Sequence, residues 1–322
     1  MKSQPATRKP FGVMVHKEIA DHIRSWRFAV LIALILLTFI ASMYVSLSNI
    51  KPATGNTNDP DRIFLYLKLL TITDNSIPPF HVFLSFLAPL LGISLGFDAV
   101  NSEQNNGTLI RLMAQPLYRD NLLLAKFASA MVIVSSLFVA LALLMIGGGL
   151  ILTGVRIEPE EFLRILGFIA LTIAYVAFWL SLSITLSVRF KPAATSALVA
   201  IGIWLFFTVF YQIVINLIIK SILPDPNFLS QAQVIYYNEL ILSLSRIAPN
   251  QLFTDGITTL LMPSVRSLGP ITMEQMAGAI PSPLPFKESL MIVWPQVSGL
   301  LASTIACFAL AYYLFMRREI RG

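Results

Sequence analysis

The stretch FDAVNSEQNNGTLIRLMAQPLYRDNLLLAKF, residues 97–127, is polar and carries Arg111 and Arg119. It lies between two apolar runs, Phe80–Val100 and Leu122–Thr153, each long enough to cross a bilayer as a helix. Its capping residues, its proline and its short apolar repeats are typical of a folded connection rather than of a loose tether. We therefore predict a structured polar region, residues 101–120, between two membrane-spanning helices.

The composition places the chain among membrane proteins. Of its 322 residues, 56% are hydrophobic and only 12% are charged, whereas soluble domains carry about 25% charged residues. The single cysteine, Cys307, excludes an internal disulfide and a cysteine-based zinc cluster, and we predict no metal site. The fold class that follows is an all-α polytopic membrane protein with a single transmembrane domain over residues 1–322.

Six apolar runs reach the roughly 20 residues that a helix needs to cross the hydrocarbon core. The predicted spans are residues 28–47, 80–100, 122–153, 162–188, 193–220 and 290–316. Because their number is even, both termini lie on the same side of the membrane.

The distribution of lysine and arginine predicts which side that is. The segments 1–27, 101–126, 189–192 and 317–322 hold 14 of the 23 basic residues, although they are short. Short, basic connections are typical of the cytoplasmic side, so we predict cytoplasmic termini. The long connections 48–79 and 221–289 are then external.

The segment before the first span, residues 10–26, is predicted to be an amphipathic helix in the plane of the lipid headgroups. Apolar residues recur at steps of three or four, and Lys17 and Asp21 are spaced for an i,i+4 ion pair. The apolar positions are Phe11, Val15, Ile19, Ile23 and Trp26. The alternative is a helix packed on another subunit.

The external connection 221–289 is predicted to hold short helices that do not cross the membrane. Helical spacing of apolar residues runs from Val234 to Leu244, Pro249 interrupts it, and a second helix follows from about Asn250 to Leu261. The remainder is rich in proline and glycine and is predicted to be irregular.

Within the polar region, Thr108 is placed to cap a short helix over residues 108–115, which Pro116 stops. Gly107 provides a hinge into this helix. At 1.5 Å per residue it would be roughly 10 Å long. A short rigid helix transmits a displacement better than a loose loop does, so this element suits a part that is moved from outside the membrane.

Three segments resemble permeases of the type-2 exporter class of ABC transporters. They are NSEQNNGTLIRLMAQPLYRDNLLLAK at 101–126, SRIAPNQLFTDGITTLLMP at 245–263, and KEIADHIRSWRF at 17–28. In the first segment the matching positions are Glu103, Gly107, Thr108, Leu109, Pro116 and Lys126. QNN at 104–106 departs from the pattern, because the family commonly has an additional charged residue there.

The resemblance implies an exporter permease that lines the pathway as a dimer, with a second copy or a homologue, and is driven by a separate cytoplasmic ATPase present in two copies. It implies that the residues coupling to the ATPase are Glu103, Gly107, Thr108, Leu109, Arg111, Leu112 and Pro116. A second cytoplasmic contact is expected at Arg189 and Lys191. The chain has no G-x-x-x-x-G-K-[ST] phosphate loop, so we expect no catalytic residue and no cofactor in it, with ATP and Mg²⁺ in the partner.

The resemblance also predicts a prokaryotic plasma-membrane protein. Beyond the ATPase and the second permease, the expected partners are an extracellular accessory protein and membrane lipids, and no nucleic acid.

Polar and small residues within the spans are candidates for lining a pathway. They are Gly92, Gly96, Asp98, Tyr211, Gln212 and Asn216. The alternatives are close helix packing for the glycines, solvation or pairing with Arg111 or Arg189 for Asp98, and hydrogen bonds between helices for the amides.

Two other function classes remain open from the residues alone. One is an ion-coupled secondary transporter, for which Asp98 is the only intramembrane carboxylate in support. The other is a membrane anchor for an extracellular partner. Copurification of a stoichiometric ATPase would distinguish the permease from both.

Overall fold

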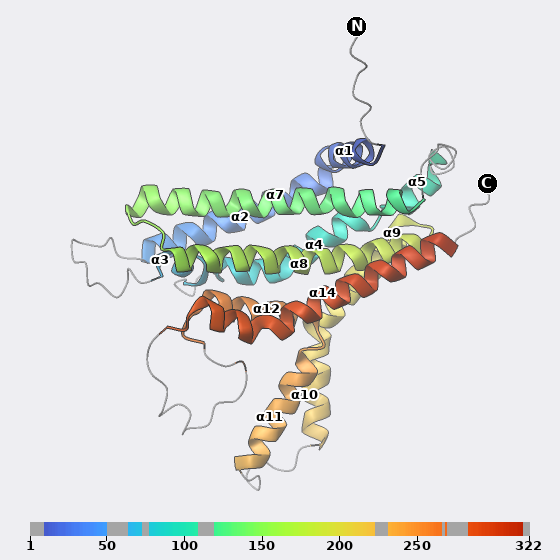
Figure 1. Ribbon diagram of the computed structural model, residues 1–322. Coiled ribbons are helices and arrows are strands. Elements are labelled where there is room, and N and C mark those ends of the chain that lie inside the picture. Colours follow the sequence, from blue (N-terminus) through green and yellow to red (C-terminus); the bar gives the residue numbers. More distant parts are fainter. Residues whose placement is uncertain are drawn as a thin grey trace.

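The structure, a computed structural model, describes residues 10–49, 64–72, 77–108, 119–222, 231–265, 268 and 283–317. Every regular element among them is helical (Figure 1). The helices are α1 (Pro10–Ile23), α2 (Trp26–Asn49), α3 (Leu65–Thr71), α4 (Phe80–Gly96), α5 (Asn101–Asn105), α7 (Arg119–Thr153), α8 (Pro159–Arg189), α9 (Ala193–Leu205), η2 (Phe206–Phe210), α10 (Tyr211–Ile222), α11 (Gln231–Ser245), α12 (Pro249–Leu261) and α14 (Phe286–Arg317). The predicted all-α membrane fold is confirmed.

Six helices are long and apolar enough to cross a membrane, as the sequence predicts. Among the described residues they are Trp26–Asn49, Phe80–Asn105, Asp120–Thr153, Pro159–Arg189, Ala193–Ser221 and Phe286–Arg317. The second of these includes α4 and α5, and the fifth includes α9, η2 and α10. Several run longer than the roughly 20 residues that a span requires.

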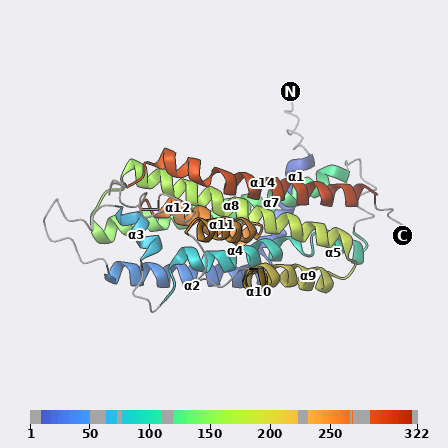
Figure 2. The same cartoon turned by 90° about the horizontal axis from the view of Figure 1, so that it is seen from below.

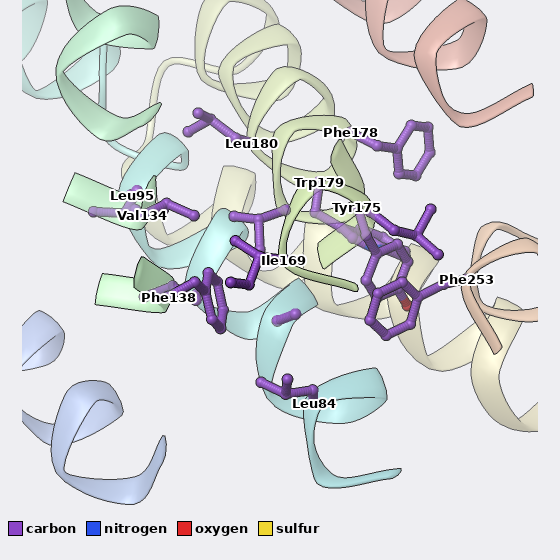
Figure 3. Close-up of a cluster of buried hydrophobic side chains, with 14 of the residues drawn as sticks. Leu84, Leu95, Val134, Phe138, Ile169, Tyr175, Phe178, Trp179, Leu180 and Phe253 are labelled. Carbon is purple, nitrogen blue, oxygen red and sulfur yellow. The ribbon is translucent and has the colours of Figure 1, made fainter. Parts of the chain in front are cut away.

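The bundle is built around α8, the most buried span, with 72% of its apolar window buried inside the protein. Helices α4, α7 and α14 run alongside α8, and α2 packs on α4 (Figures 1 and 2). We call the end that carries α1, α5 and the end of α14 the α5 end, and the opposite one, with α3, the α3 end. In the middle, Tyr175 of α8 stacks on Phe253 of α12 with ring centroids 4.1 Å apart (Figure 3).

Helices α4 and α8 approach each other closely because glycines face the contact. A Cβ atom added at Gly92 would lie 2.8 Å from the Val176 carbonyl oxygen, and one at Gly96 would lie 2.9 Å from the Leu180 carbonyl oxygen. Atoms that close would overlap, so a larger residue would separate the helices. The contact fixes α4, and therefore the start of α5, against the central helix.

The fifth span is not one straight helix. Helix α9 follows the bundle, the π-helical turn η2 interrupts the regular pattern, and α10 then leaves the bundle with α11 beside it (Figures 1 and 2). The Tyr211 hydroxyl donates a hydrogen bond of 2.8 Å to the Leu244 carbonyl oxygen, which holds α10 against α11. Insertions of a π-helical turn are frequent at functional sites.

The α3 end is tied together by a fully buried arginine. Arg164 of α8 donates hydrogen bonds from Nη1 to the Leu260 carbonyl oxygen at 2.9 Å and to the Ser289 Oγ at 3.3 Å. Its Nη2 donates to the Leu284 carbonyl oxygen and pairs with Glu160 at 3.1 Å. Helix α12 and the start of α14 are therefore fixed to the beginning of α8.

The two helices predicted in the connection 221–289 are confirmed as α11 and α12, with Pro249 as the first residue of α12. The sequence did not predict α3, which lies in the other connection that is predicted to be external. Its Tyr66 is buried against Gly149, where a Cβ atom would lie 2.6 Å from the Tyr66 ring. The Tyr66 hydroxyl donates to the Val155 carbonyl oxygen at 2.7 Å, so α3 closes the end of the bundle.

Replacing Gly96 by alanine should lower the free energy of unfolding by about 1–3 kcal/mol, because the new methyl group would force two backbones apart. The readout is the midpoint of thermal unfolding of the purified protein in detergent. Gly202→Ala is the matched control, since this α9 glycine has no atom within 4 Å of an added Cβ. Alanine favours helix, so the control should keep or raise the midpoint. Equal midpoints for the two variants would contradict the close α4–α8 contact.

Candidate functional site

At the α5 end, one buried ammonium group joins three helices. Lys126 of α7 lies 2.9 Å from Glu18 Oε2 of α1 and 2.9 Å from Glu103 Oε1 of α5. The three side chains are only 5%, 10% and 10% exposed. Lys17 lies 3.3 Å from Glu18 and 3.8 Å from Glu103. We call these four residues the Lys126 cluster.

The local sequence explains why each group reaches the cluster. Glu18 is buried because α1 packs on α7, with Met14 and Ile19 of the same helix contacting the core. Glu103 is held in place because α5 is anchored to α8. The backbone N–H groups of Val100 and Asn101 donate to Ser187 Oγ at 2.9 and 3.3 Å. The cluster therefore connects α1 and α7 to an element that is fixed on the central helix.

Charge pairing sets the protonation of Glu18. Burial alone would raise the pKa of the Glu18 carboxyl, but the charge and the hydrogen bond of Lys126 outweigh burial and hold that pKa below its usual value. The contribution of Glu18 to stability is therefore present at neutral pH and is lost as the pH falls through the lowered pKa. Burial lowers the pKa of the neighbouring His22, so its ring is neutral at pH 7.

A second ion pair lies beside the cluster. Arg27 Nη1 donates to Asp98 Oδ2 at 3.0 Å, and the Arg27 guanidinium lies 4.9 Å from the centroid of the Phe97 ring. Asp98 therefore pairs with Arg27 of the first span and not with Arg189, one of the partners that the sequence suggests. Between this pair and the Lys126 cluster lies a polar cavity of about 510 Å³.

The predicted coupling residues fall partly within the described region. Glu103 belongs to the cluster. Gly107 has a positive φ of 67°, which glycine adopts without strain, and ends α5. The Thr108 hydroxyl donates to the Glu103 carbonyl oxygen at 3.1 Å. The other predicted residues, Leu109, Arg111, Leu112 and Pro116, lie outside the described residues, as does most of the predicted helix 108–115.

The two predicted cytoplasmic segments meet. Asn105 Nδ2, at the end of α5, donates to the Lys191 carbonyl oxygen at 3.2 Å. Arg189 and Lys191 flank the turn between α8 and α9, and both side chains are exposed. Their role as a second contact for a partner stays a prediction.

The candidate pathway residues are dispersed. Gly92 and Gly96 face α8, as described above. Tyr211 bonds to α11, while Gln212 and Asn216 are exposed on one face of α10. These positions therefore contact different helices, and a pathway role for them stays a prediction.

Sequence reasoning missed Glu18 as a member of the site. A carboxylate within an amphipathic helix is ordinarily solvated. The burial of Glu18 is explained only by its ion pair with Lys126 of α7. The one signal is its spacing: Met14, Glu18 and His22 recur every four residues, which places them on one helical face.

Replacing Lys126 by methionine should destabilise the protein by on the order of 3 kcal/mol, because two buried carboxylates would lose their shared cation. Lys17→Met is the control: its side chain is 54% exposed, so its loss should cost less than about 1 kcal/mol. Thermal unfolding in detergent measures both. The triple variant E18Q/E103Q/K126M leaves no buried charge in the cluster and should recover most of the stability. Equal effects of the two lysine variants would contradict the buried pairing.

Comparison with known proteins identifies the family. A family model described as ABC-2 family transporter protein matches residues 13–320. Two bacterial relatives are both named probable ABC transporter permease protein NosY. The Pseudomonas aeruginosa protein is 29% identical over 208 residues, covering 62% of this chain and 67% of the relative. The Stutzerimonas stutzeri protein is 28% identical over 219 residues, covering 63% and 68%. A family match over nearly the whole chain, on a bundle with six apolar spans, shows that this protein belongs to the ABC-2 family of transporter proteins and is a multi-pass membrane permease.

Proposed function

We propose that this chain is the membrane-spanning subunit of an ATP-driven exporter, and that the Lys126 cluster couples it to a separate cytoplasmic ATPase. The observation that carries the proposal is the position of Lys126, which joins α1 to α5 and α7, the helices that precede and follow the segment resembling a coupling helix. The family match supports an ATP-binding partner in general. The family match therefore favours an ATP-driven permease over an ion-coupled secondary transporter and over a membrane anchor for an extracellular partner.

The proposed orientation places the α5 end in the cytoplasm and the α3 end outside. The α5 end carries Arg27, Arg189, Lys191 and Arg317, and the sequences of the two terminal segments, 1–9 and 318–322, are also basic. An excess of lysine and arginine in short segments is the usual mark of the cytoplasmic side. The two relatives are bacterial, which supports a prokaryotic plasma-membrane protein.

The ATPase would supply the chemistry that this chain lacks. Two copies, each binding ATP and Mg²⁺, would sit beneath a pair of permeases and contact residues 107–116. This chain would contribute no catalytic residue and no cofactor. Glu103, Gly107 and Thr108 would form the rigid base of the contact, because Thr108 and Glu103 are hydrogen-bonded and Gly107 sets the direction of the chain.

The cluster would convert movement of the coupling segment into movement of whole helices. Helix α5 has five residues, too few to be stable alone. The ion pair with Lys126 and the hydrogen bond to Ser187 attach α5 to α7 and α8, so that α5 would move together with these helices. A displacement at Thr108 would therefore shift α4 and α7 together with α1 instead of bending a loose connection.

Charge reversal at Glu103 tests the coupling. In vesicles that contain the permease with its ATPase, Glu103→Lys should leave membrane insertion and ATP hydrolysis in place while transport falls at least tenfold, because Lys126 would face a second cation. Glu288→Lys is the control: Glu288 is exposed in the first turn of α14, at the opposite end. The assay compares ATP hydrolysed with substrate moved. Unchanged transport in Glu103→Lys, or an equal loss in the control, would contradict the coupling role.

The dimer is proposed to form through the fifth span. Only 11% of its apolar window is buried, the least among the six spans, and Gln212 and Asn216 are exposed there. An unpaired amide in hydrocarbon is unfavourable, so these side chains favour a protein partner over lipid. The partner would be a second copy or a homologue.

Cysteine cross-linking tests the dimer. In a Cys307→Ser background, Asn216→Cys should form a disulfide between two copies under mild oxidation, because the same face of each α10 would meet at a two-fold axis. Met291→Cys, which is 65% exposed on α14, is the control and should stay monomeric on a non-reducing gel. Cross-linking in the control alone would place the interface elsewhere.

The α3 end is the proposed site for an extracellular accessory protein. Helix α12 belongs to the connection 221–289, which is proposed to be external, and Arg164 fixes it to α8 at the α3 end. A partner bound to this connection would therefore contact an element that is firmly joined to the central helix.

A further inference from the structure

A pocket at the α5 end, separate from the Lys126 cluster, is lined by three basic side chains. It has a volume of about 510 Å³ and lies between the end of α8, the turn that follows, and the end of α14. Its lining residues are Val188, Arg189, Phe190, Lys191, Leu314 and Arg317. We propose that this pocket binds the phosphate headgroup of an anionic phospholipid.

Within the part of the chain that the structure describes, the basic residues of this pocket have no carboxylate partner, in contrast to Lys126 and Arg27 at the same end. Lys126 and Arg27 each pair with a carboxylate. No carboxylate lines the pocket, and none among the described residues forms an ion pair with Arg189, Lys191 or Arg317. Three cations that converge on one cavity repel one another unless an anion lies between them. The pocket chemistry therefore favours an anion.

The position of the pocket favours a lipid as the source of that anion. Arg189 and Arg317 are the last residues of two apolar spans, so they lie at the depth where headgroups begin. The remainder of the lining is apolar, namely Val188, Phe190 and Leu314. Leu314 precedes Arg317 by about one turn of α14, on the side toward the bundle. A phosphate joined to acyl chains matches a pocket that combines basic and apolar residues at the ends of two apolar spans.

Aromatic residues mark the same depth. Tyr312 and Tyr313 are exposed on α14 just before Arg317, and exposed tyrosines are typical of the boundary between hydrocarbon and water. The Arg317 guanidinium lies 4.5 Å from the centroid of the Tyr313 ring, which limits its orientation. Two arginine forks and one lysine can together donate to the several oxygens of one phosphate.

The experiment measures lipid binding by the full chain, purified in a non-ionic detergent without an ATPase. Native mass spectrometry follows the binding of phosphatidylglycerol and of phosphatidylcholine at increasing lipid concentration. We expect the protein to prefer phosphatidylglycerol. The variant R189Q/K191Q/R317Q should bind it at least tenfold more weakly and lose the preference, since each basic group near a membrane surface contributes about fivefold. All three side chains are exposed, so the variant should fold, and its elution and thermal unfolding confirm this.

The variant R24Q/R156Q/K220Q is the matched control, because it removes the same charge from exposed positions outside the pocket. It should change phosphatidylglycerol binding less than about twofold. Equal weakening by both triple variants would overturn the pocket in favour of general surface charge. Displacement of the lipid by low millimolar inorganic phosphate would overturn the lipid assignment in favour of a free anion.

A third outcome separates this inference from the proposed ATPase contact. If R189Q/K191Q/R317Q kept its lipid preference but no longer copurified with the ATPase, these side chains would serve the protein partner and the lipid site would be wrong. The inference rests only on the placement of this end at a membrane surface. Its failure would leave the coupling role of Glu103 untouched, and the reverse also holds.

Discussion

A single buried ammonium group holds the α5 end of this permease together. Removing a charge from water is unfavourable unless partners of opposite charge are in place. Lys126 has two such partners, Glu18 and Glu103. Because those carboxylates come from α1 and α5, the pairing is complete only when both elements lie against α7. The pairing thereby joins α1 and α5 to α7, in addition to the apolar contacts of α1 and the hydrogen bonds of α5 to Ser187.

Helix α8 connects the α5 end to the α3 end of the bundle. Near its end, Ser187 accepts the first backbone N–H groups of α5, and near its beginning Arg164 donates to carbonyl groups of α12 and of the segment before α14. Between them, glycines let α4 approach its backbone. A helix of 31 residues is about 45 Å long. Under the proposed function, a push at one membrane surface would reach the other through one continuous rigid element.

The sequence predicted the parts of this fold that depend on local pattern. The six spans, the break at Pro249 and the i,i+4 pair of Lys17 and Asp21, now 3.6 Å apart, all follow from periodicity and spacing. What depends on contacts between distant segments could not be predicted. The burial of Glu18 requires knowledge of Lys126, 108 positions away. The choice of Arg27 as the partner of Asp98 likewise depends on how two spans are placed side by side. The sequence did not predict helix α3 because its seven residues are stabilised by packing against the bundle rather than by intrinsic helix propensity.

The same distinction separates the basic residues of the α5 end, which the positive-inside rule treats alike. By count, Arg27, Lys126, Arg189 and Arg317 all argue for one orientation. Their contacts differ, however. Arg27 and Lys126 form ion pairs with carboxylates of the described residues, whereas Arg189 and Arg317, together with Lys191, line an open pocket. A cation in an ion pair stabilises the fold, so its removal lowers the free energy of unfolding. A cation at a membrane surface without a carboxylate partner can instead attract an anionic ligand. Whether a lysine or arginine is paired therefore indicates its role more directly than its position along the chain.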